Sequence, residues 1–198
     1  HHRVKNNLAI IIGLIELQKE EMADNQTALL LNETQNRIYS ISGVHELLYQ
    51  TENFSEISIG EYVDNLLDRI KMTYQSEGSK VRIRRDINSL HVNINQAIPL
   101  GLLLNELITN SLKHAFNGIE KGEIWLELHE QNDSFEIFYK DNGIGLEKVV
   151  FEKASTLGLT LIKTLLAQLS ADYQIEAGEG FSIRFQFPIK DIGPHSAI

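Results

Sequence analysis

One stretch near the middle of the chain, residues 95–116, sets the strongest limit on how the chain can fold. Its apolar residues recur every three or four positions, which is the spacing of an α-helix with one face against a core. These residues are Leu100, Leu103, Leu104, Leu107, Ile108, Leu112 and Ala115. The spacing predicts one amphipathic helix, with Asn95 as its N-cap and Pro99 in its first turn.

The other side of this predicted helix carries four different polar groups. They are Glu106, Asn110, Lys113 and His114, at positions i, i+4, i+7 and i+8. This spacing places a carboxylate, a carboxamide, an ammonium and an imidazole along one side of the helix, as a magnesium–nucleotide site requires. An ordinary solvated face has the same composition, so the helix alone leaves both interpretations open.

The composition narrows the classes of function. The 198 residues are enough for one large or two small domains, and the net charge of −9 argues against a nucleic-acid partner. The absence of Cys excludes disulfides and thiol catalysis. The longest apolar run, residues 8–15, is far shorter than the roughly 20 residues that span a bilayer. We therefore expect a soluble piece of a longer protein, without direct membrane contact.

Two long helical patterns open the chain, over residues 2–22 and 26–49, with a short polar break between them. They predict an antiparallel helical hairpin. Because such a hairpin cannot cover both of its apolar stripes alone, we expect a homodimer whose two hairpins form a four-helix bundle. The alternative is that the hairpin packs on the rest of its own chain. The polar stretch 51–57 is the expected domain boundary.

The remaining patterns alternate between strands and helices. A capping box of Ser58 and Glu61 opens a predicted helix, and Asn-Gly and Gln-Asn-Asp turns separate later segments. We expect helices over residues 58–74 and 157–169, and strands from residue 81 and over residues 90–94, 123–130, 134–140, 171–176 and 181–188. No helical pattern is evident between residues 146 and 155. This order predicts a mixed sheet with helices on one face, a two-layer α+β sandwich.

Two glycine-containing segments follow the central helix. Residues 141–145 (DNGIG) come directly after a strand and read either as a hairpin turn or as backbone that approaches a ligand. The residues beyond Gly145 do not alternate like a returning strand, which favours the ligand. Residues 155–159 (STLGL) precede a helix, whose N-terminus suits a phosphate, although a simple capped helix is an equal alternative.

Taken together, these segments resemble a known family. The order NELITNSLKHAF, DNGIGL, STLGLTLIKTL and GEGFSIRFQFP is similar to the nucleotide-binding boxes of the GHKL ATPase superfamily, and the opening HHRVKNNL resembles the phosphoacceptor box of sensor histidine kinases with an H-R-x-K-N signature. The resemblance covers residues 1–188, and its five boxes stand in the expected order.

The resemblance implies roles for particular residues. His2 would accept the γ-phosphoryl group of ATP, with Glu106 and Lys113 as the other catalytic residues. Glu106 and Asn110 would lie at Mg²⁺, and Asp141 would read the adenine amine. The residues expected to contact the nucleotide are Asn110, Lys113, His114, Asp141, Gly143, Gly145, Ser155, Thr156, Gly158 and Leu159.

The expected protein is therefore the cytoplasmic catalytic core of a sensor histidine kinase. Residues 1–52 would form the dimerisation and phosphoacceptor hairpin, and residues 53–198 the ATP-binding domain. The phosphoryl group would pass to an Asp of a response-regulator receiver domain, and an upstream sensor domain would lie outside this fragment. Two alternatives remain: a GHKL-type serine kinase, and a nucleotide-responsive dimerisation module without turnover. The second stays open because Lys153 and Ala154 stand where the family often has glycine.

Overall fold

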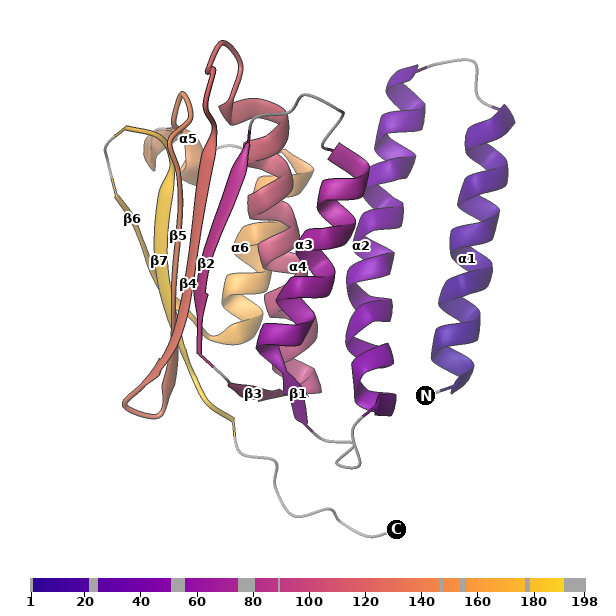
Figure 1. Ribbon diagram of the computed structural model, residues 1–198, viewed down its shortest axis with the longest axis horizontal. Helices are drawn as coiled ribbons and strands as arrows, with labels where there is room; N and C mark the ends of the chain where they lie inside the picture. The colour runs from indigo at the N-terminus through magenta and orange to yellow at the C-terminus, as the bar shows by residue number, and fades with distance from the viewer. Residues whose placement is uncertain are drawn as a thin grey trace, which may run out of the picture.

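The chain begins with two long antiparallel helices (Figure 1). The computed structural model describes residues 2–21, 25–50, 56–74, 81–88, 90–146, 148–153, 156–176 and 179–190. Helix α1 (His2–Glu21) and helix α2 (Asn25–Gln50) match the predicted hairpin to within a residue. Gln35 of α2 donates to the Ile12 carbonyl of α1 at 3.4 Å and accepts from Lys19 at 3.1 Å. Most of the predicted polar break lies outside the described residues.

The hairpin packs on the rest of its own chain through one helix. Helix α2 lies between α1 and α3 (Ile59–Tyr74), as Figure 1 shows. The Tyr62 hydroxyl of α3 donates to the Ser40 carbonyl at 3.2 Å, and the Asn36 amide donates to the Tyr74 hydroxyl at 3.1 Å. The predicted alternative is thus confirmed for α2. Helix α1 lies on the outer side, away from the sheet, and keeps large apolar side chains exposed.

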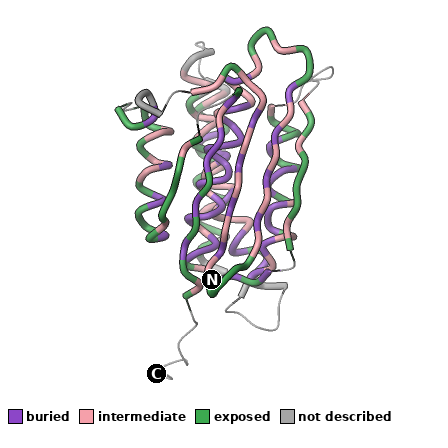
Figure 2. The backbone as a smooth tube through the Cα atoms, turned by 90° about the vertical axis from the view of Figure 1, so that its left-hand side faces the viewer, coloured by how far each residue is buried: buried purple, intermediate pink, exposed green. Residues whose placement is uncertain are grey.

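A five-stranded mixed sheet forms the second layer. Its strand order is β2-β4-β5-β7-β6, in which only the β2–β4 pairing is parallel. The strands are β2 (Arg82–Ile87), β4 (Glu123–Gln131), β5 (Ser134–Asp141), β6 (Asp172–Glu176) and β7 (Ser182–Pro188). Residues alternate between buried and half-buried along most of β4 and all of β5, whereas the edge strands are mostly exposed (Figure 2).

Helices cover one face of this sheet, so the predicted two-layer sandwich is confirmed. Helices α3, α4 (Ile94–Asn110) and α6 (Leu157–Leu169) lie on the same side of the strands in Figure 1. The alternating apolar residues of the strands pack there against the apolar stripes of the helices, in one continuous core. None of the helices within the described ranges is long and apolar enough to cross a membrane.

Two short elements differ from the sequence prediction. Residues 56 and 57 were expected to be irregular and Ser58 to open a helix, but residues 56–58 form strand β1 (Glu56–Ser58), which pairs antiparallel with β3 (His91–Asn93). Residues 148–153, where no helix was expected, form helix α5 (Lys148–Lys153). Both elements are too short to show a hydrophobic period, so their sequences alone could not reveal them. Residues 51–55 of the expected domain boundary lie outside the described part.

The central helix begins earlier and ends differently than expected. Its N-cap is Asn93, whose side chain accepts from the Gln96 amide at 3.1 Å, and not Asn95. Pro99 consequently lies in the second turn, where its ring removes one helical hydrogen bond. The last turn, residues 111–115, is a π-helix (η1, Ser111–Ala115). Such wide turns are frequent at functional sites, because they re-aim backbone and side-chain groups.

Candidate functional site

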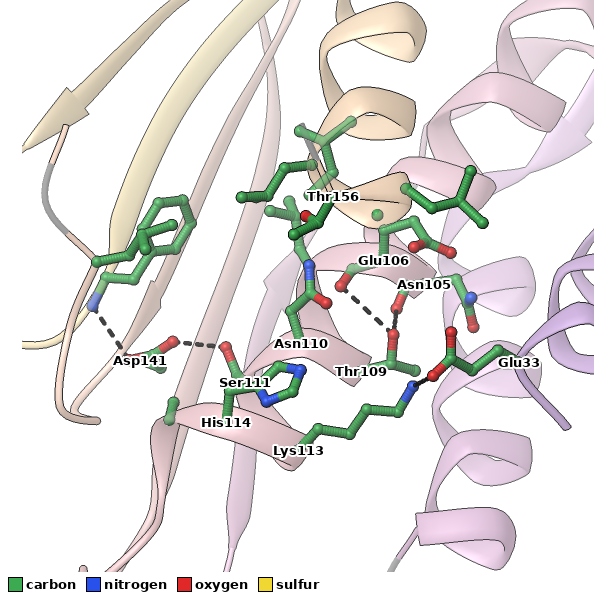
Figure 3. Close-up of a pocket in the computed structure, with 18 of the residues that line it drawn as sticks. Glu33, Asn105, Glu106, Thr109, Asn110, Ser111, Lys113, His114, Asp141 and Thr156 are labelled. Carbon is green, nitrogen blue, oxygen red and sulfur yellow. Dashed lines mark hydrogen bonds and ion pairs between the residues drawn. The ribbon is translucent and has the colours of Figure 1, made fainter. Parts of the chain in front are cut away.

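A cavity of about 480 Å³ opens between α4, η1, the start of α6 and the loop after β5. This size is typical of small-molecule sites. Figure 3 shows Asp141 at one end and the carboxylate and ammonium groups of Glu106 and Lys113 toward the other. The predicted residues that line the cavity are Glu106, Asn110, Lys113, His114, Asp141, Gly145, Thr156, Gly158 and Leu159. The structure thus brings together segments that are far apart in the sequence.

Of the predicted residues that the structure describes, Gly143 and His2 do not line this cavity. Gly143 lies beside it, where its amide donates to Asp141 at 2.9 Å. Ser155 is outside the described residues. His2 is the first residue of α1, and Ile12, ten positions later, is level with Gln35 of α2. Because ten residues of α-helix rise about 15 Å, His2 lies toward the far end of the hairpin from the cavity.

Asp141 ends β5 and is 1% exposed. Its Oδ1 accepts two backbone amides, from Gly143 at 2.9 Å and from Phe181 at 3.1 Å. Its Oδ2 accepts the hydroxyl of Ser111. A carboxylate offers about four acceptor positions, so one position on Oδ2 remains. A buried carboxylate with one acceptor position left suits a ligand that carries an amine.

Glycine residues allow the loop after β5 to lie close to the π-helix and to the backbone at residue 180. The Ile144 amide donates to the Ala115 carbonyl at 2.9 Å, which joins the loop to the π-helix. A Cβ at Gly143 would lie 2.4 Å from the Ala115 Cβ, and a Cβ at Gly180 would lie 1.9 Å from the Asp141 carbonyl oxygen. Gly180 also has a φ of +79°, which other residues rarely adopt. The glycine pattern of the sequence therefore serves close backbone packing around Asp141.

The opposite end of the cavity is held by ion pairs from the hairpin. The buried Glu106 carboxylate accepts two bonds from Arg37, at 2.7 Å from Nε and 2.9 Å from Nη2. The Glu106 carboxylate raises the pKa of Arg37, so the guanidinium stays charged. Lys113 donates to Glu33 at 2.6 Å. Two predicted site residues are thus paired with α2, and no pattern in the sequence indicates this pairing.

The residues at this end fit a magnesium–phosphate group. A Cβ at Gly158 would lie 3.3 Å from Glu106 Oε2 and 3.6 Å from Asn110 Oδ1, so both oxygens lie near the start of α6. The side chain of Thr156, the N-cap of α6, makes no capping bond, and the amides of a helix N-terminus suit a phosphate. No group of three or more His, Cys, Asp or Glu is placed for a metal among the described residues. Magnesium commonly takes few protein oxygens and completes its shell with phosphates and water.

Several lining residues were not predicted. Helices α2 and α3 supply polar and aromatic groups, the central helix adds neighbours of the predicted residues, and apolar side chains form the walls. They are Glu33, Arg37, Tyr74, Asn105, Leu107, Thr109, Ser111, Ala115, Ile144, Leu146, Leu157, Ile162 and Phe181. For Asn105, Thr109 and Ser111 the signal was their position beside Glu106 and Asn110 in the same helix.

The fold and this site define a nucleotide-binding ATPase domain joined to a helical hairpin, and comparisons agree. A family model described as histidine kinase matches residues 1–74. A second, described as histidine kinase-, DNA gyrase B-, and HSP90-like ATPase, matches residues 95–191. The chain therefore belongs to the histidine kinases with a GHKL-type ATPase domain, and the resemblance found in the sequence is confirmed.

Individual relatives are similar to parts of this chain, and one solved structure shares its fold. The sensor histidine kinase PdtaS of Mycolicibacterium smegmatis is 30% identical over 168 residues, which cover 84% of this chain and 33% of PdtaS. The histidine kinase domain from Erythrobacter litoralis EL346 blue-light activated histidine kinase has a TM-score of 0.72 at 20% identity, covering 95% of this chain and 88% of that domain. The serine-protein kinase RsbW of Listeria innocua is 34% identical over 99 residues, 42% of this chain and 60% of RsbW. The chain spans about a third of the length of PdtaS.

Proposed function

We propose that this chain is the catalytic core of a sensor histidine kinase working in the cytoplasm. It uses ATP and Mg²⁺ to phosphorylate His2, and then passes the phosphoryl group to an Asp of a response-regulator receiver domain. Residues 1–52 are the dimerisation and phosphoacceptor hairpin, and residues 53–198 are the ATP-binding domain. The observation that carries this proposal is the cavity between Asp141 and the Glu106–Asn110–Lys113 group, on a chain whose hairpin begins with His2.

The chain's own residues divide the work along the cavity. The last acceptor position of Asp141 takes the amine of adenine. Lys113 and the start of α6 hold the phosphates, while Glu106 and Asn110 offer oxygens to Mg²⁺. When bound, Mg²⁺ neutralises charge on the phosphates. A nitrogen of the His2 imidazole, which is a good nucleophile when neutral, forms the bond to the γ-phosphorus while the bond to the ADP oxygen breaks.

This chemistry requires a movement of the hairpin or a second copy of the chain. His2 lies far from the cavity in the described arrangement, and the ion pairs Arg37–Glu106 and Lys113–Glu33 join the hairpin to the cavity wall. Transfer within one chain therefore requires the hairpin to move, which would break at least one of these pairs. Conformational steps of this kind limit the rate of many enzymes.

A second copy of the chain would cover the outer face of α1. Ile10, Leu14 and Leu17 are 62%, 56% and 61% exposed, although all three are large apolar residues of a helical stripe. A four-helix bundle made from two hairpins buries such a face. Sedimentation analysis is expected to show a dimer, and to show a monomer for the doubly substituted Leu14→Glu/Leu17→Glu chain. A wild-type chain that sediments as a monomer would contradict this part of the proposal.

Incubation with radiolabelled ATP and Mg²⁺ tests the proposed activity. We expect protein-bound label that is labile in acid and stable in alkali, as phosphohistidine is. The label should be absent from His2→Gln and present in His91→Gln, a matched substitution at an exposed histidine of β3. Label that persists in His2→Gln would overturn the assignment of His2.

Nucleotide binding is tested separately by calorimetry. Asp141→Asn replaces one carboxylate oxygen with an NH2 group, which donates and cannot accept, and we expect it to abolish ATP binding. Unchanged affinity would refute the adenine role of Asp141. The similarity to a serine-protein kinase over 99 residues makes a serine kinase the second candidate, which predicts acid-stable label on a partner. The match of the hairpin to a histidine kinase family favours the first.

A further inference from the structure

Two buried hydroxyl groups form a hydrogen-bond network that ends on the Asp141 carboxylate. The Ser111 hydroxyl, in the first residue of the π-helix, donates to Asp141 Oδ2. The Tyr139 hydroxyl, from β5, lies 2.7 Å from the Ser111 oxygen and 3.1 Å from the Leu107 carbonyl. Ser111 is 4% exposed and Tyr139 is fully buried, so the protein itself supplies the partners of both hydroxyl groups.

The direction of the hydrogen bonds in this network follows from which groups can donate. An ionised carboxylate only accepts, so Ser111 must donate its proton to Asp141. Tyr139 has one hydroxyl proton, and the Ser111 oxygen is its nearer acceptor. Burial raises the pKa of Tyr139 well above its ordinary value, so the phenol remains a donor. Each hydroxyl thus donates toward Asp141, and the network has one orientation.

Such a network is not needed to fill the core. Buried hydroxyl groups are costly unless all their bonds are made, and apolar residues of the same size would fill this space without that cost. The network instead determines which acceptor positions of the Asp141 carboxylate stay free. Two backbone amides occupy Oδ1, and the Ser111 hydroxyl occupies one of the two positions on Oδ2. The remaining position is therefore fixed in direction.

We propose that Ser111 and Tyr139 are positioning residues for base recognition. They orient Asp141 so that its single remaining acceptor selects a purine with an amino group at position 6 over one with hydrogen there. This inference rests on the proposed ATP-binding function and deepens it, because it names the groups that make the Asp141 end of the cavity specific.

The test compares two nucleotides on the complete chain. Calorimetry in Mg²⁺ measures the affinity for ATP and for purine riboside triphosphate, which lacks only the 6-amino group. A hydrogen bond to a charged group corresponds to about a tenfold preference for ATP in the wild-type chain. In Ser111→Ala we expect about a tenfold loss of ATP affinity and less than about a twofold change for the analogue, so the preference disappears. Tyr139→Phe should give a smaller loss in the same direction, because the Ser111 hydroxyl remains.

The chain offers a matched control for each substitution. Ser40 is 3% exposed, and its hydroxyl donates to the Asn36 carbonyl of its own helix. Tyr62 is 2% exposed, and its hydroxyl donates to a backbone carbonyl of α2. Ser40→Ala and Tyr62→Phe remove the same groups from equally buried places that do not touch Asp141. Both should keep the ATP preference of the wild-type chain.

The outcomes distinguish a failure of this inference from a failure of the proposed ATP-binding function. A wild-type chain that does not bind ATP would overturn both. A wild-type chain that prefers ATP, with the preference unchanged in Ser111→Ala and Tyr139→Phe, would overturn the positioning role alone. An equal loss of affinity for both nucleotides would also overturn it, because a purely structural effect does not distinguish the 6-amino group.

Discussion

The pair between Arg37 and Glu106 joins the hairpin to the wall of the cavity, and Arg37→Met tests what it contributes. Methionine keeps a long apolar stem and removes the guanidinium. The Glu106 side chain is only 3% exposed, and it would lose both charged bonds, at 2.7 and 2.9 Å. The substitution therefore leaves a carboxylate buried without its partner.

The expected size follows from that burial. Removing one partner of a buried ion pair costs about 3–5 kcal/mol, because the other charge stays desolvated. The control is Arg84→Met. Arg84 donates to Glu123 at 2.8 Å, but these two side chains are 53% and 24% exposed, and an exposed pair is worth about 0–1 kcal/mol. The two arginine substitutions should therefore differ by about 2 kcal/mol or more.

Urea unfolding, followed by the fluorescence of Trp125, measures these free energies. Trp125 is the single tryptophan and lies on β4, so it reports on the sheet that the central helix covers. Adding Glu106→Gln to Arg37→Met removes the unpaired charge, and should recover most of the loss. If Arg37→Met costs no more than Arg84→Met, and Glu106→Gln recovers nothing, the buried pair does not hold the hairpin in place.

Two further predictions concern the loop at Asp141 and the effect of pH. Gly143→Ala would place a Cβ 2.4 Å from that of Ala115 and should lower the free energy of unfolding by about 1–3 kcal/mol. Gly13→Ala, whose Cβ would meet nothing within 4 Å, should raise the free energy of unfolding by up to about 1 kcal/mol. Thermal unfolding measures both changes. Burial lowers the pKa of His45 below 6.5, so the unfolded chain binds the proton more tightly and stability should fall as the pH drops below 6.5. The unfolding free energy of His45→Asn should depend less on pH over this range, and an equal dependence would contradict the reasoning.

The order of helices and strands was predictable because most elements are long enough to show a period. The hairpin, α3, the β4–β5 pair and α6 all follow from hydrophobic spacing and turn residues. The prediction was wrong where an element is short, as at β1 and α5, and at the N-cap of α4. Asn93 and Asn95 are equally good caps by residue type, and only the pairing of β3 with β1 decides where the strand stops.

The site was predictable to the extent that it is contiguous in sequence. Glu106, Asn110 and Lys113 follow one helix, so their spacing alone places them together. Arg37 comes from a helix whose polar residues resemble any solvated face, and only the packing of α2 on α4 shows what it binds. Ser111 is similar, because its partner Asp141 is brought beside it by β5.

Mapping the phosphorylated residue tests the central claim most directly. After incubation with ATP and Mg²⁺, cleavage after glutamate at neutral pH releases residues 1–16, which contain no histidine other than His1 and His2. Mass spectrometry with fragmentation of that peptide should find one phosphoryl group on His2. Phosphate on a serine, a threonine or another histidine, with His2 unmodified while ATP is consumed, would contradict the account.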